Sequence, residues 1–260
     1  MVLVVAEGQG RRVAEEDRAM KLLVTSDWHA DAKTIGHARF GDVERAVGEM
    51  VQRAIELRVG AFLFLGDLCD PDSGSAAFRS VELAVSAAMT LSRAGIRSIW
   101  MAGNHDVIED GSGDTTLSPL RPLDCMGSLV EVVERPRCLE LGVGLRLQLL
   151  PYTATSHPYD PKAEVDGLDW RGCKLVVAGH LAVEGVEPGE ETTDMPRGRD
   201  VVFPRECFSL ADKVVLLNGH YHRQQTHERP GFVPLSIPGS PARFTFGEQD
   251  NRPGYLIVEV

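Results

Sequence analysis

Polar side chains follow five short apolar runs in this sequence, at the point where each run ends. A glycine stands immediately before the first polar residue in four of these five turns. Seven residues in these positions carry oxygen or nitrogen ligand atoms: Asp27, His29, Asp67, Asn104, His180, His220 and His222. Because open α/β sheets place binding sites just beyond the carboxyl ends of their strands, we expect these side chains to lie close together.

Each of these residues, taken alone, has an ordinary structural explanation. An aspartate after a strand is commonly a helix N-cap, and a lone histidine is more often a surface or hydrogen-bonded residue. Gly103-Asn104 alone would be an ordinary turn. The combination argues otherwise, because five of the eight histidines fall at strand ends. We therefore predict a metal site.

The ligand types indicate which metals would bind. Aspartate, asparagine and histidine without thiolate suit Mn²⁺, Fe²⁺ or Zn²⁺; Mn²⁺ is our first expectation, and Mg²⁺ is a further alternative. Seven ligands are too many for one ion, so we expect two divalent ions roughly 3.5–4 Å apart with one bridging carboxylate. Such a pair can hold a bridging hydroxide that attacks a phosphoryl group, so the expected chemistry is phosphoester hydrolysis.

The apolar runs read as buried strands, because they are short and rich in Val, Ile, Leu or Phe. They cover residues 21–25, 61–65, 96–101, 174–178 and 213–217. Apolar residues at helical spacing predict helices over 40–57 and 78–93. The resulting βαβαβ order implies a parallel sheet with right-handed crossovers.

The middle and the end of the chain predict further strands. Residues 129–133, 138–141 and 145–150 are separated by Arg135-Pro136 and by 142–144, and we expect them to form an antiparallel meander. Residues 233–237 and 255–260 predict a final pair of strands. The expected fold class is α/β, with two mixed β-sheets packed face to face and flanked by helices.

Composition places the chain among ordinary globular proteins, with 43% hydrophobic and 25% charged residues. No run approaches the roughly 18 apolar residues of a membrane span, and the first residues lack signal-peptide order, so we expect a cytoplasmic protein. The five cysteines form no C-x-x-C pair, which predicts neither disulfides nor a structural zinc site. Residues 1–19 are expected to be an N-terminal extension, and 20–260 a single large domain.

The ordered motifs D-x-H, G-D-x-x-D, G-N-H-D, G-H and G-H-x-H resemble those of the calcineurin-like metallophosphoesterases, over residues 20–260. The resemblance implies a four-layer sandwich without a capping domain. It implies a first metal held by Asp27, His29, Asp67 and His222. It implies a second metal held by Asp67, Asn104, His180 and His220, with Asp67 as the bridge.

The same resemblance assigns catalytic roles beside the metals. It implies that His105 is the acid that assists the leaving group and that Asp70 orients it as a His–Asp pair. A carboxylate behind an imidazole raises its basicity and fixes its tautomer. Asp106 is expected only to stabilise its turn.

Two further stretches resemble the Mre11/SbcD DNA-repair nucleases: KLLVTSDWHAD (residues 21–31) and the segment 239–248, which fits G-S-x-x-R-x-x-F-G-E. The resemblance implies an exo- or endonuclease that hydrolyses DNA. Those nucleases usually continue into a capping domain and a segment that docks an SMC-like ATPase, whereas this chain stops at Val260. We therefore expect either an ATPase partner that supplies the grip on DNA or a small stand-alone nuclease; the family also implies a homodimer.

Two questions have alternative answers: which substrate the protein hydrolyses, and whether it is an enzyme or a structural protein. The net charge of −11 argues against tight DNA binding by this chain alone and favours a phosphomonoester, a cyclic nucleotide or another small phosphodiester. A non-catalytic structural protein would show an eroded motif, and all five motifs are intact. Some arginines in or near loops could contact phosphates or be ordinary surface charges: Arg121, Arg199, Arg205, Arg223 and Arg243.

Overall fold

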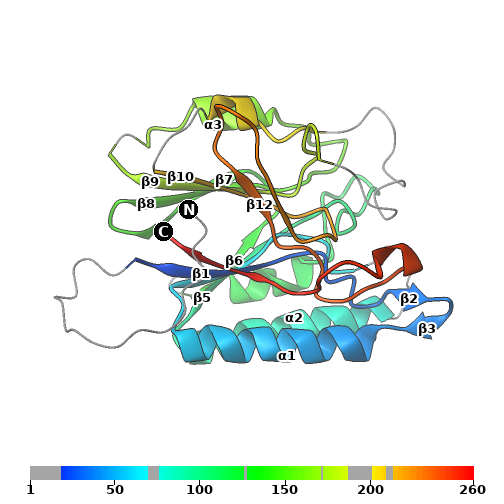
Figure 1. Cartoon of the computed structure of the whole chain (residues 1–260). Coiled ribbons are helices and arrows are strands. Elements are labelled where there is room, and N and C mark those ends of the chain that lie inside the picture. The colour runs from blue at the N-terminus through cyan, green and yellow to red at the C-terminus, as the bar shows by residue number, and fades with distance from the viewer. Residues whose placement is uncertain (1–18, 70–75, 126–127, 171, 187–200, 209–212) are drawn as a thin grey trace.

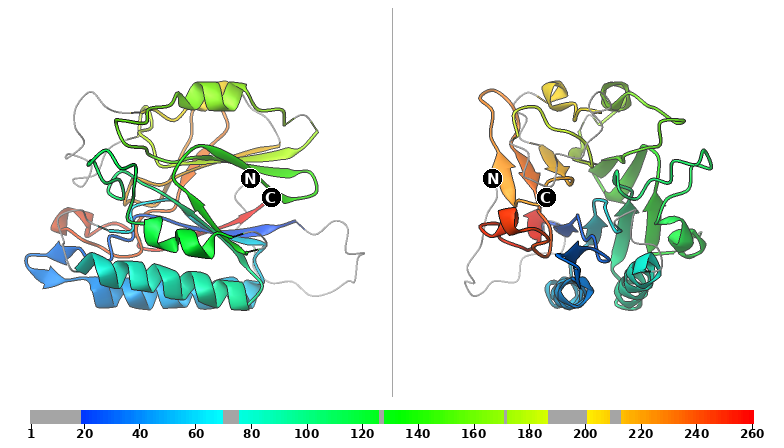
Figure 2. Two further views of the ribbon diagram at one scale, coloured as in Figure 1. Left: turned by 180° about the vertical axis from the view of Figure 1, so that it is seen from behind. Right: turned by 90° about the vertical axis from the view of Figure 1, so that its right-hand side faces the viewer.

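Two β-sheets lie face to face at the centre of the protein (Figure 1). The computed structural model describes residues 19–69, 76–125, 128–170, 172–186, 201–208 and 213–260. Helices α1 and α2 cover the outer face of one sheet, and α3 lies over the outer face of the other (Figures 1 and 2). This four-layer arrangement confirms the expected α/β fold class.

The first sheet has the strand order β13-β1-β4-β5-β6. Its strands are β1 (Lys21–Thr25), β4 (Ala61–Phe64), β5 (Arg97–Met101), β6 (Val130–Val133) and β13 (Leu256–Glu259). The strands β1, β4, β5 and β6 are parallel, and β13 is antiparallel to β1. Helix α1 (Phe40–Leu57) connects β1 to β4, and α2 (Ala76–Arg93) connects β4 to β5. The predicted βαβαβ unit is therefore confirmed.

Helix α1 forms because its apolar residues recur every three or four positions along one face. The buried members of this stripe are Phe40, Val43, Val47, Met50, Val51 and Ala54. The helix ends where Arg58 adopts the left-handed conformation and donates its backbone N–H to the carbonyls of Ala54 and Ile55. A small hairpin, β2 (Lys33–Thr34) and β3 (His37–Ala38), precedes the helix.

The second sheet has the order β11-β12-β10-β9-β8-β7. Its strands are β7 (Arg137–Gly142), β8 (Leu145–Leu150), β9 (Lys174–Gly179), β10 (Val214–Asn218), β11 (Gln225–His227) and β12 (Leu235–Ile237). The four inner strands are parallel, and both edge strands are antiparallel to their neighbours. Helix α3 (Pro161–Asp166) begins at Asp160, whose side chain accepts the backbone N–H of Lys162.

Alternating side chains of the first sheet build two separate hydrophobic layers. Leu23, Phe62 and Phe64 pack toward the helices, together with Trp100. Their neighbours in the same strands face the second sheet: Leu22, Val24, Ala61, Leu63, Ile99 and Met101. The first sheet is therefore buried on both faces, as its continuous apolar runs predict.

Two expected strand pairings are wrong. β6 does not open a meander with β7 but adds to the first sheet, parallel to β5. The chain crosses to the other sheet between Val133 and Arg137, so Arg135-Pro136 is a crossing point between layers rather than a hairpin turn. The two final strands also separate: β12 pairs with β10 and β11, and β13 pairs with β1. Local turn signals cannot reveal which of two stacked sheets a strand joins.

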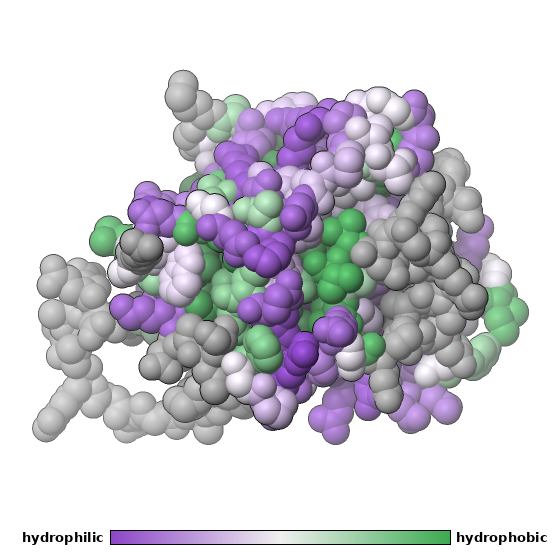
Figure 3. Space-filling view, turned by 90° about the horizontal axis from the view of Figure 1, so that it is seen from above, coloured by the Kyte–Doolittle hydropathy of each residue, from purple (hydrophilic) through white to green (hydrophobic). Residues whose placement is uncertain are grey.

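Four remaining features are the surface, possible membrane spans, the cysteines and the N-terminal residues. Polar and apolar residues are interspersed where the upper side of the molecule, with α3, faces the viewer (Figure 3). In the described part of the chain, each helix is too short or too polar to cross a membrane. All five cysteines are free thiols. The expected extension, residues 1–19, lies outside the described residues except for its last position, so this boundary stays a prediction.

Replacing Leu149 by alanine should lower the free energy of unfolding by about 2–5 kcal/mol, because Leu149 is fully buried between the sheets and truncation leaves a cavity. Urea denaturation measures the change. Val143→Ala is the control, because Val143 lies fully exposed next to β8; it should change stability by less than about 0.5 kcal/mol. Equal midpoints for the two variants would contradict the layered packing.

Candidate metal centre

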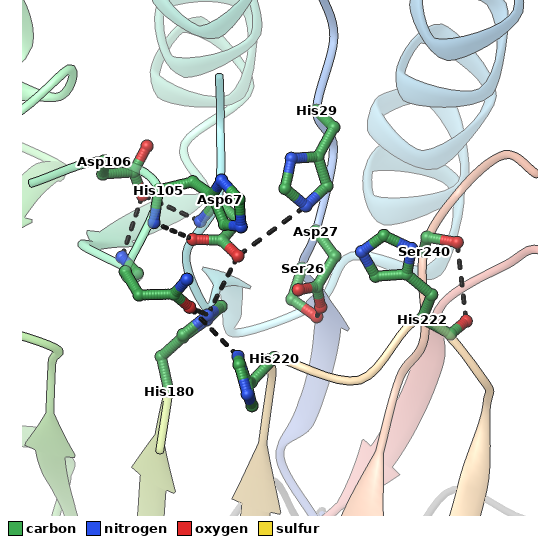
Figure 4. Close-up of polar contacts among 12 residues, drawn as sticks. Ser26, Asp27, His29, Asp67, His105, Asp106, His180, His220, His222 and Ser240 are labelled. Atoms are coloured by element: carbon green, nitrogen blue, oxygen red, sulfur yellow. Dashed lines mark hydrogen bonds and ion pairs between the residues drawn. The ribbon is translucent and has the colours of Figure 1, made fainter. Parts of the chain in front are cut away.

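The ligand-bearing turns of the two sheets meet beyond the ends of their strands, and their side chains point toward one another (Figure 4). β1, β4 and β5 run parallel in the first sheet, and β9 and β10 run parallel in the second. The turns that follow these five strands carry all seven residues that the sequence singles out as ligands. The expected convergence therefore occurs, although the binding of metal by these residues stays a prediction.

A first group of potential ligands is formed by Asp27, His29 and His222. One donor atom from each residue lies within 4.8 Å of the donor atoms of the other two, and all three residues are buried. Oδ1 of Asp27 and Nε2 of His29 are buried without a hydrogen-bond partner among the described residues. Buried polar atoms are normally hydrogen-bonded, so this pair of atoms fits a site for a cation.

A second group is formed by Asp67, His180 and His220, joined by Asn104. Oδ1 of Asn104 lies 3.0 Å from Nε2 of His180 and 3.0 Å from Nδ1 of His220. Nε2 of His180 lies 3.1 Å from Oδ2 of Asp67. An ion with bonds of about 2.1 Å at right angles places neighbouring ligands about 3.0 Å apart. The spacing of this group therefore fits one divalent ion.

Asp67 stands between the two groups. Its Oδ2 lies 3.1 Å from Nε2 of His180 in one group and 3.7 Å from Nε2 of His29 in the other. Its Oδ1 accepts the backbone N–H of His105 at 2.9 Å, so Oδ2 is the oxygen that faces both groups (Figure 4). A carboxylate in this place is suited to bridge two ions.

The backbone at these ligands is strained. Asp27, His29, Asp67 and His220 have φ values of 54°, 36°, 61° and 77°, in the left-handed region. This region costs a residue other than glycine of order 1–3 kcal/mol. Such strain persists where the surrounding structure enforces it, and here both sheets hold the turns in place.

Two glycines are required by close contacts at the centre. Gly66 has φ of 100°, and a Cβ there would lie 2.5 Å from Nδ1 of His180. A Cβ at Gly103 would lie 2.2 Å from Oδ1 of Asp67. Gly66 therefore lets the turn of the first sheet approach His180 of the second, and Gly103 lets the turns after β4 and β5 lie close together.

Asp106 has a wider role than the expected stabilisation of its own turn. Its Oδ2 accepts the backbone N–H groups of Gly103 and Asp67, both at 2.8 Å, and its Oδ1 accepts that of Leu68 at 2.9 Å. The hydroxyl of Thr116 also donates to it. Burial, together with the charge of Asp67, raises the pKa of Asp106 to about 6. Asp106 thus fastens the turn after β5 to the turn after β4.

Two other residues that support the ligands, Glu248 and Asn218, were not predicted from the sequence. Glu248 accepts from Nδ1 of His222 at 2.8 Å. Asn218, fully buried at the end of β10, donates to the carbonyls of Leu181 and Gly219 at 2.9 and 2.7 Å and so ties the two histidine-bearing turns together. The sequence offered one signal for each: Asn218 is a polar residue at the end of an apolar run, and Glu248 lies in the segment 239–248.

The electrostatics of the centre differ from one ligand to the next. Burial lowers the pKa of His220 to about 3 and that of His29 well below its usual range, and the neutral imidazole is the form that binds metals. Burial opposes protonation of His180 too, but Asp67 raises its pKa to about 9. In turn, His180 outweighs the effect of burial and holds the pKa of Asp67 well below its usual range. Burial raises the pKa of Asp27.

His105 lies beside both groups. Its ring packs edge-on against that of His29, with 4.9 Å between the ring centroids. Its Nδ1 is buried without a hydrogen-bond partner among the described residues, and His105, His29 and Asp67 also form a possible ligand group. Asp70, the expected partner of His105, lies outside the described residues, so the His–Asp pair stays a prediction.

Comparison with curated proteins finds related sequences over most of the chain. The SbcD component of the nuclease SbcCD of Escherichia coli, from strain K12 and from O157:H7, is 24% identical over 265 residues, which cover 88% of this chain. The match covers 62% of the relatives' own length, so this chain spans less than two thirds of them.

Two solved structures share the fold. A dimetal phosphatase from Danio rerio superposes with a TM-score of 0.53 at 11% identity, covering 86% of this chain and 88% of its own. A purple acid phosphatase from yellow lupin (Lupinus luteus) seeds has a TM-score of 0.54 at 12% identity, covering 85% and 44%. At such identities the likeness concerns the fold alone.

A sequence match to a known family covers the whole candidate site. The sequence pattern of the calcineurin-like phosphoesterase family matches residues 20–224, which include every residue of the two ligand groups. The family uses a dinuclear divalent metal site, and the two groups joined by Asp67 provide for one. We conclude that this chain belongs to the calcineurin-like phosphoesterase family of phosphoester hydrolases.

Proposed function

We propose that the protein hydrolyses phosphodiester bonds of DNA. The observation that carries this proposal is the position of the segment 239–248, which marks the resemblance to the DNA-repair nucleases. Phe244 in this segment packs against His29 and His222, with ring centroids 5.7 and 5.6 Å apart. Glu248 in the same segment bonds His222. The part of the sequence that favours DNA is thus part of the wall of the metal centre.

The donor set fits two divalent ions, and we propose Mn²⁺, with Fe²⁺, Zn²⁺ and Mg²⁺ as alternatives. Asp27, His29 and His222 would hold one ion, His180, His220 and Asn104 the other, and Asp67 would contact both. When bound, two such ions activate water and neutralise charge on a phosphoryl group. The chain's own contribution is to hold these ligands in positions that are buried, or half-buried for Asn104.

His105 is proposed to be the catalytic acid. Its place beside His29 and Asp67 puts its imidazole at the border of the two ligand groups. An imidazole there can donate a proton to the sugar oxygen that leaves as the phosphodiester bond breaks. Asp70 is proposed to orient it from behind.

Of the arginines considered for phosphate contacts, we propose two, one of which, Arg243, also donates from Nε to the carbonyl of Asn251. Arg223 and Arg243 are exposed, and each adjoins a residue of the centre, His222 or Phe244. Arg205 is 4% exposed and donates to the carbonyls of His227 and Val233, and Arg121 is paired with Asp114 and Glu134. Arg199 lies outside the described residues.

The net charge of −11 bears on partners. A polyanion is held mainly by basic side chains, and a chain with this excess of acidic residues is poorly equipped to hold one alone. An SMC-like ATPase that supplies a basic surface is therefore proposed as partner, in keeping with the relative named as one component of a nuclease. A homodimer and a cytoplasmic location stay predictions.

A small phosphoester is the second candidate substrate, because the negative charge disfavours DNA more than it disfavours a single phosphate. Phosphomonoesters and cyclic nucleotides are the forms to test.

The substrate test compares DNA with a small ester in Mn²⁺ at low salt. The assay uses linear and circular DNA, single- and double-stranded, and at least one of these forms should be cleaved. Arg223→Ala and Arg243→Ala should reduce DNA cleavage several-fold more than hydrolysis of p-nitrophenyl phosphate, and each should reduce the salt dependence of DNA binding by about one phosphate contact. Arg93→Ala, at the far end of α2, is the control. Brisk hydrolysis of the small ester without cleavage of any DNA would sink the nuclease proposal.

Replacing His105 by alanine should lower kcat by about 10²–10⁴-fold, the usual contribution of a general acid, while the metal content stays unchanged. Steady-state kinetics and elemental analysis measure the two quantities, with the exposed His37→Ala as control. A variant that loses metal yet stays fast would show that His105 is a ligand rather than the acid.

Metal stoichiometry tests the two ligand groups. Asp27→Ala should lose one ion and His180→Ala the other, whereas Asp67→Ala should lose both, because Asp67 faces both groups. Elemental analysis after dialysis against Mn²⁺ measures the content, with Asp42→Ala as control, because Asp42 is a half-exposed carboxylate in the first turn of α1 that no ligand group includes. If Asp27→Ala and His180→Ala each retained two ions, the assignment would be wrong.

A further inference from the structure

Glu248 is a buried carboxylate with both oxygens engaged. It is 1% exposed and ends the short turn Phe246–Glu248. Its Oε1 lies 2.8 Å from Nδ1 of His222, and its Oε2 accepts the backbone N–H of Phe244 at 2.6 Å. A carboxylate in this position is rarely buried without a specific task, because burying a charge is costly unless it is paired and hydrogen-bonded.

The contact with His222 fixes the state of that ring. An ionised carboxylate only accepts hydrogen bonds, so Nδ1 of His222 must carry the proton. Nε2 is then the basic nitrogen of the ring, and the ring lies in the group with Asp27 and His29. Partners of this kind orient histidine ligands and raise their basicity.

The two ligand groups differ in this respect. His180 in the second group also uses its Nδ1, but its acceptor is the neutral carbonyl oxygen of Leu65 at 2.6 Å. His222 has a charged acceptor. The first group therefore contains a histidine whose Nδ1 faces a carboxylate that is not itself one of the proposed ligands.

The segment that carries Glu248 is fastened to the site at other points. The backbone N–H of Ser240 donates to the carbonyl of His222 at 3.0 Å. The hydroxyl of Thr34, in the β2–β3 hairpin, donates to the carbonyl of Phe244 at 2.7 Å. These bonds fasten the backbone of the segment to the turn of His222 and to the β2–β3 hairpin, while the side chain of Glu248 is held by His222 and by the N–H of Phe244.

We propose that Glu248 is a positioning residue: it sets the tautomer of His222 and thereby the metal affinity of the group formed by Asp27, His29 and His222. This inference rests on the proposed metal centre but is independent of the substrate.

Glu248→Gln is the sharpest variant, because glutamine has the same shape but only one acceptor oxygen. The NH₂ group of the glutamine must face either Nδ1 of His222 or the N–H of Phe244, so one of these two hydrogen bonds loses its acceptor. The variant also removes the negative charge. Glu131→Gln is the matched control: Glu131 is a half-buried carboxylate paired with Arg97 and Arg137, on β6.

Calorimetric titration of chelator-treated protein with Mn²⁺ measures affinity for each of the two ions. In Glu248→Gln, one dissociation constant should rise about 10–100-fold, the usual effect of losing such a partner, and the other should change less than about threefold. Nitrogen-15 spectra of the histidine side chains should show the proton of His222 on Nδ1 in the natural protein and a redistributed proton in the variant. Glu131→Gln should alter neither.

The outcomes separate the inference from the proposed centre. Natural protein that binds no Mn²⁺ overturns the centre itself. Two bound ions with unchanged constants in Glu248→Gln overturn the role of Glu248 alone. Equal weakening of both ions together with a lowered unfolding temperature would show a merely structural role and also overturn it. A spectrum of the natural protein with the His222 proton on Nε2 overturns it even if the variant fails to fold.

Discussion

The rest of the centre depends on the contacts that the carboxylate of Asp67 makes. One of its oxygens faces His180 and His29, which belong to different ligand groups, and the other holds the backbone of His105. Its position therefore sets the spacing of both groups at once. Because Asp106 in turn holds the backbone N–H of Asp67, the turns after β4 and β5 form one unit. A shift in either turn would displace the ligands of both proposed ions.

Three buried carboxylates around the centre have donors or a histidine as partners. Asp106 and Glu248 are buried, and their oxygens accept backbone N–H groups or an imidazole proton. Asp67 is balanced by His180. By contrast, Oδ1 of Asp27 and Nε2 of His29 have no hydrogen-bond partner among the described residues. A buried acceptor without a donor costs about 1–3 kcal/mol, and a divalent ion would satisfy both atoms together. This imbalance is a physical argument for metal that does not depend on the family.

The parts of the structure that follow from local rules could be predicted from the sequence, and the parts that depend on packing between layers could not. The ligand-bearing turns were predictable because parallel strands end at one edge. Helix α1 was predictable to its last residue because its stripe is continuous. The pairing of β6 was not, since Arg135-Pro136 looks the same in a hairpin and in a crossing between sheets. The role of Glu248 was also hidden, because it lies 26 residues from His222, and only the fold brings them together.

The segment 239–248 has one side buried against the first ligand group and another side exposed to solvent. Phe244 and Glu248 are buried against the first ligand group, while Arg243 and Phe246 in the same turn face solvent. A substrate that contacts the exposed residues therefore touches a turn whose other side orients His222. In the proposed function, recognition at this rim and metal binding beneath it would share one short piece of backbone, so a change that adapts the rim to a new substrate would also act on the metal position. The cationic side chain of this rim is Arg243, whose Nε donates to the carbonyl of Asn251 at 3.0 Å, so the rim has one positive charge in a chain with a net charge of −11.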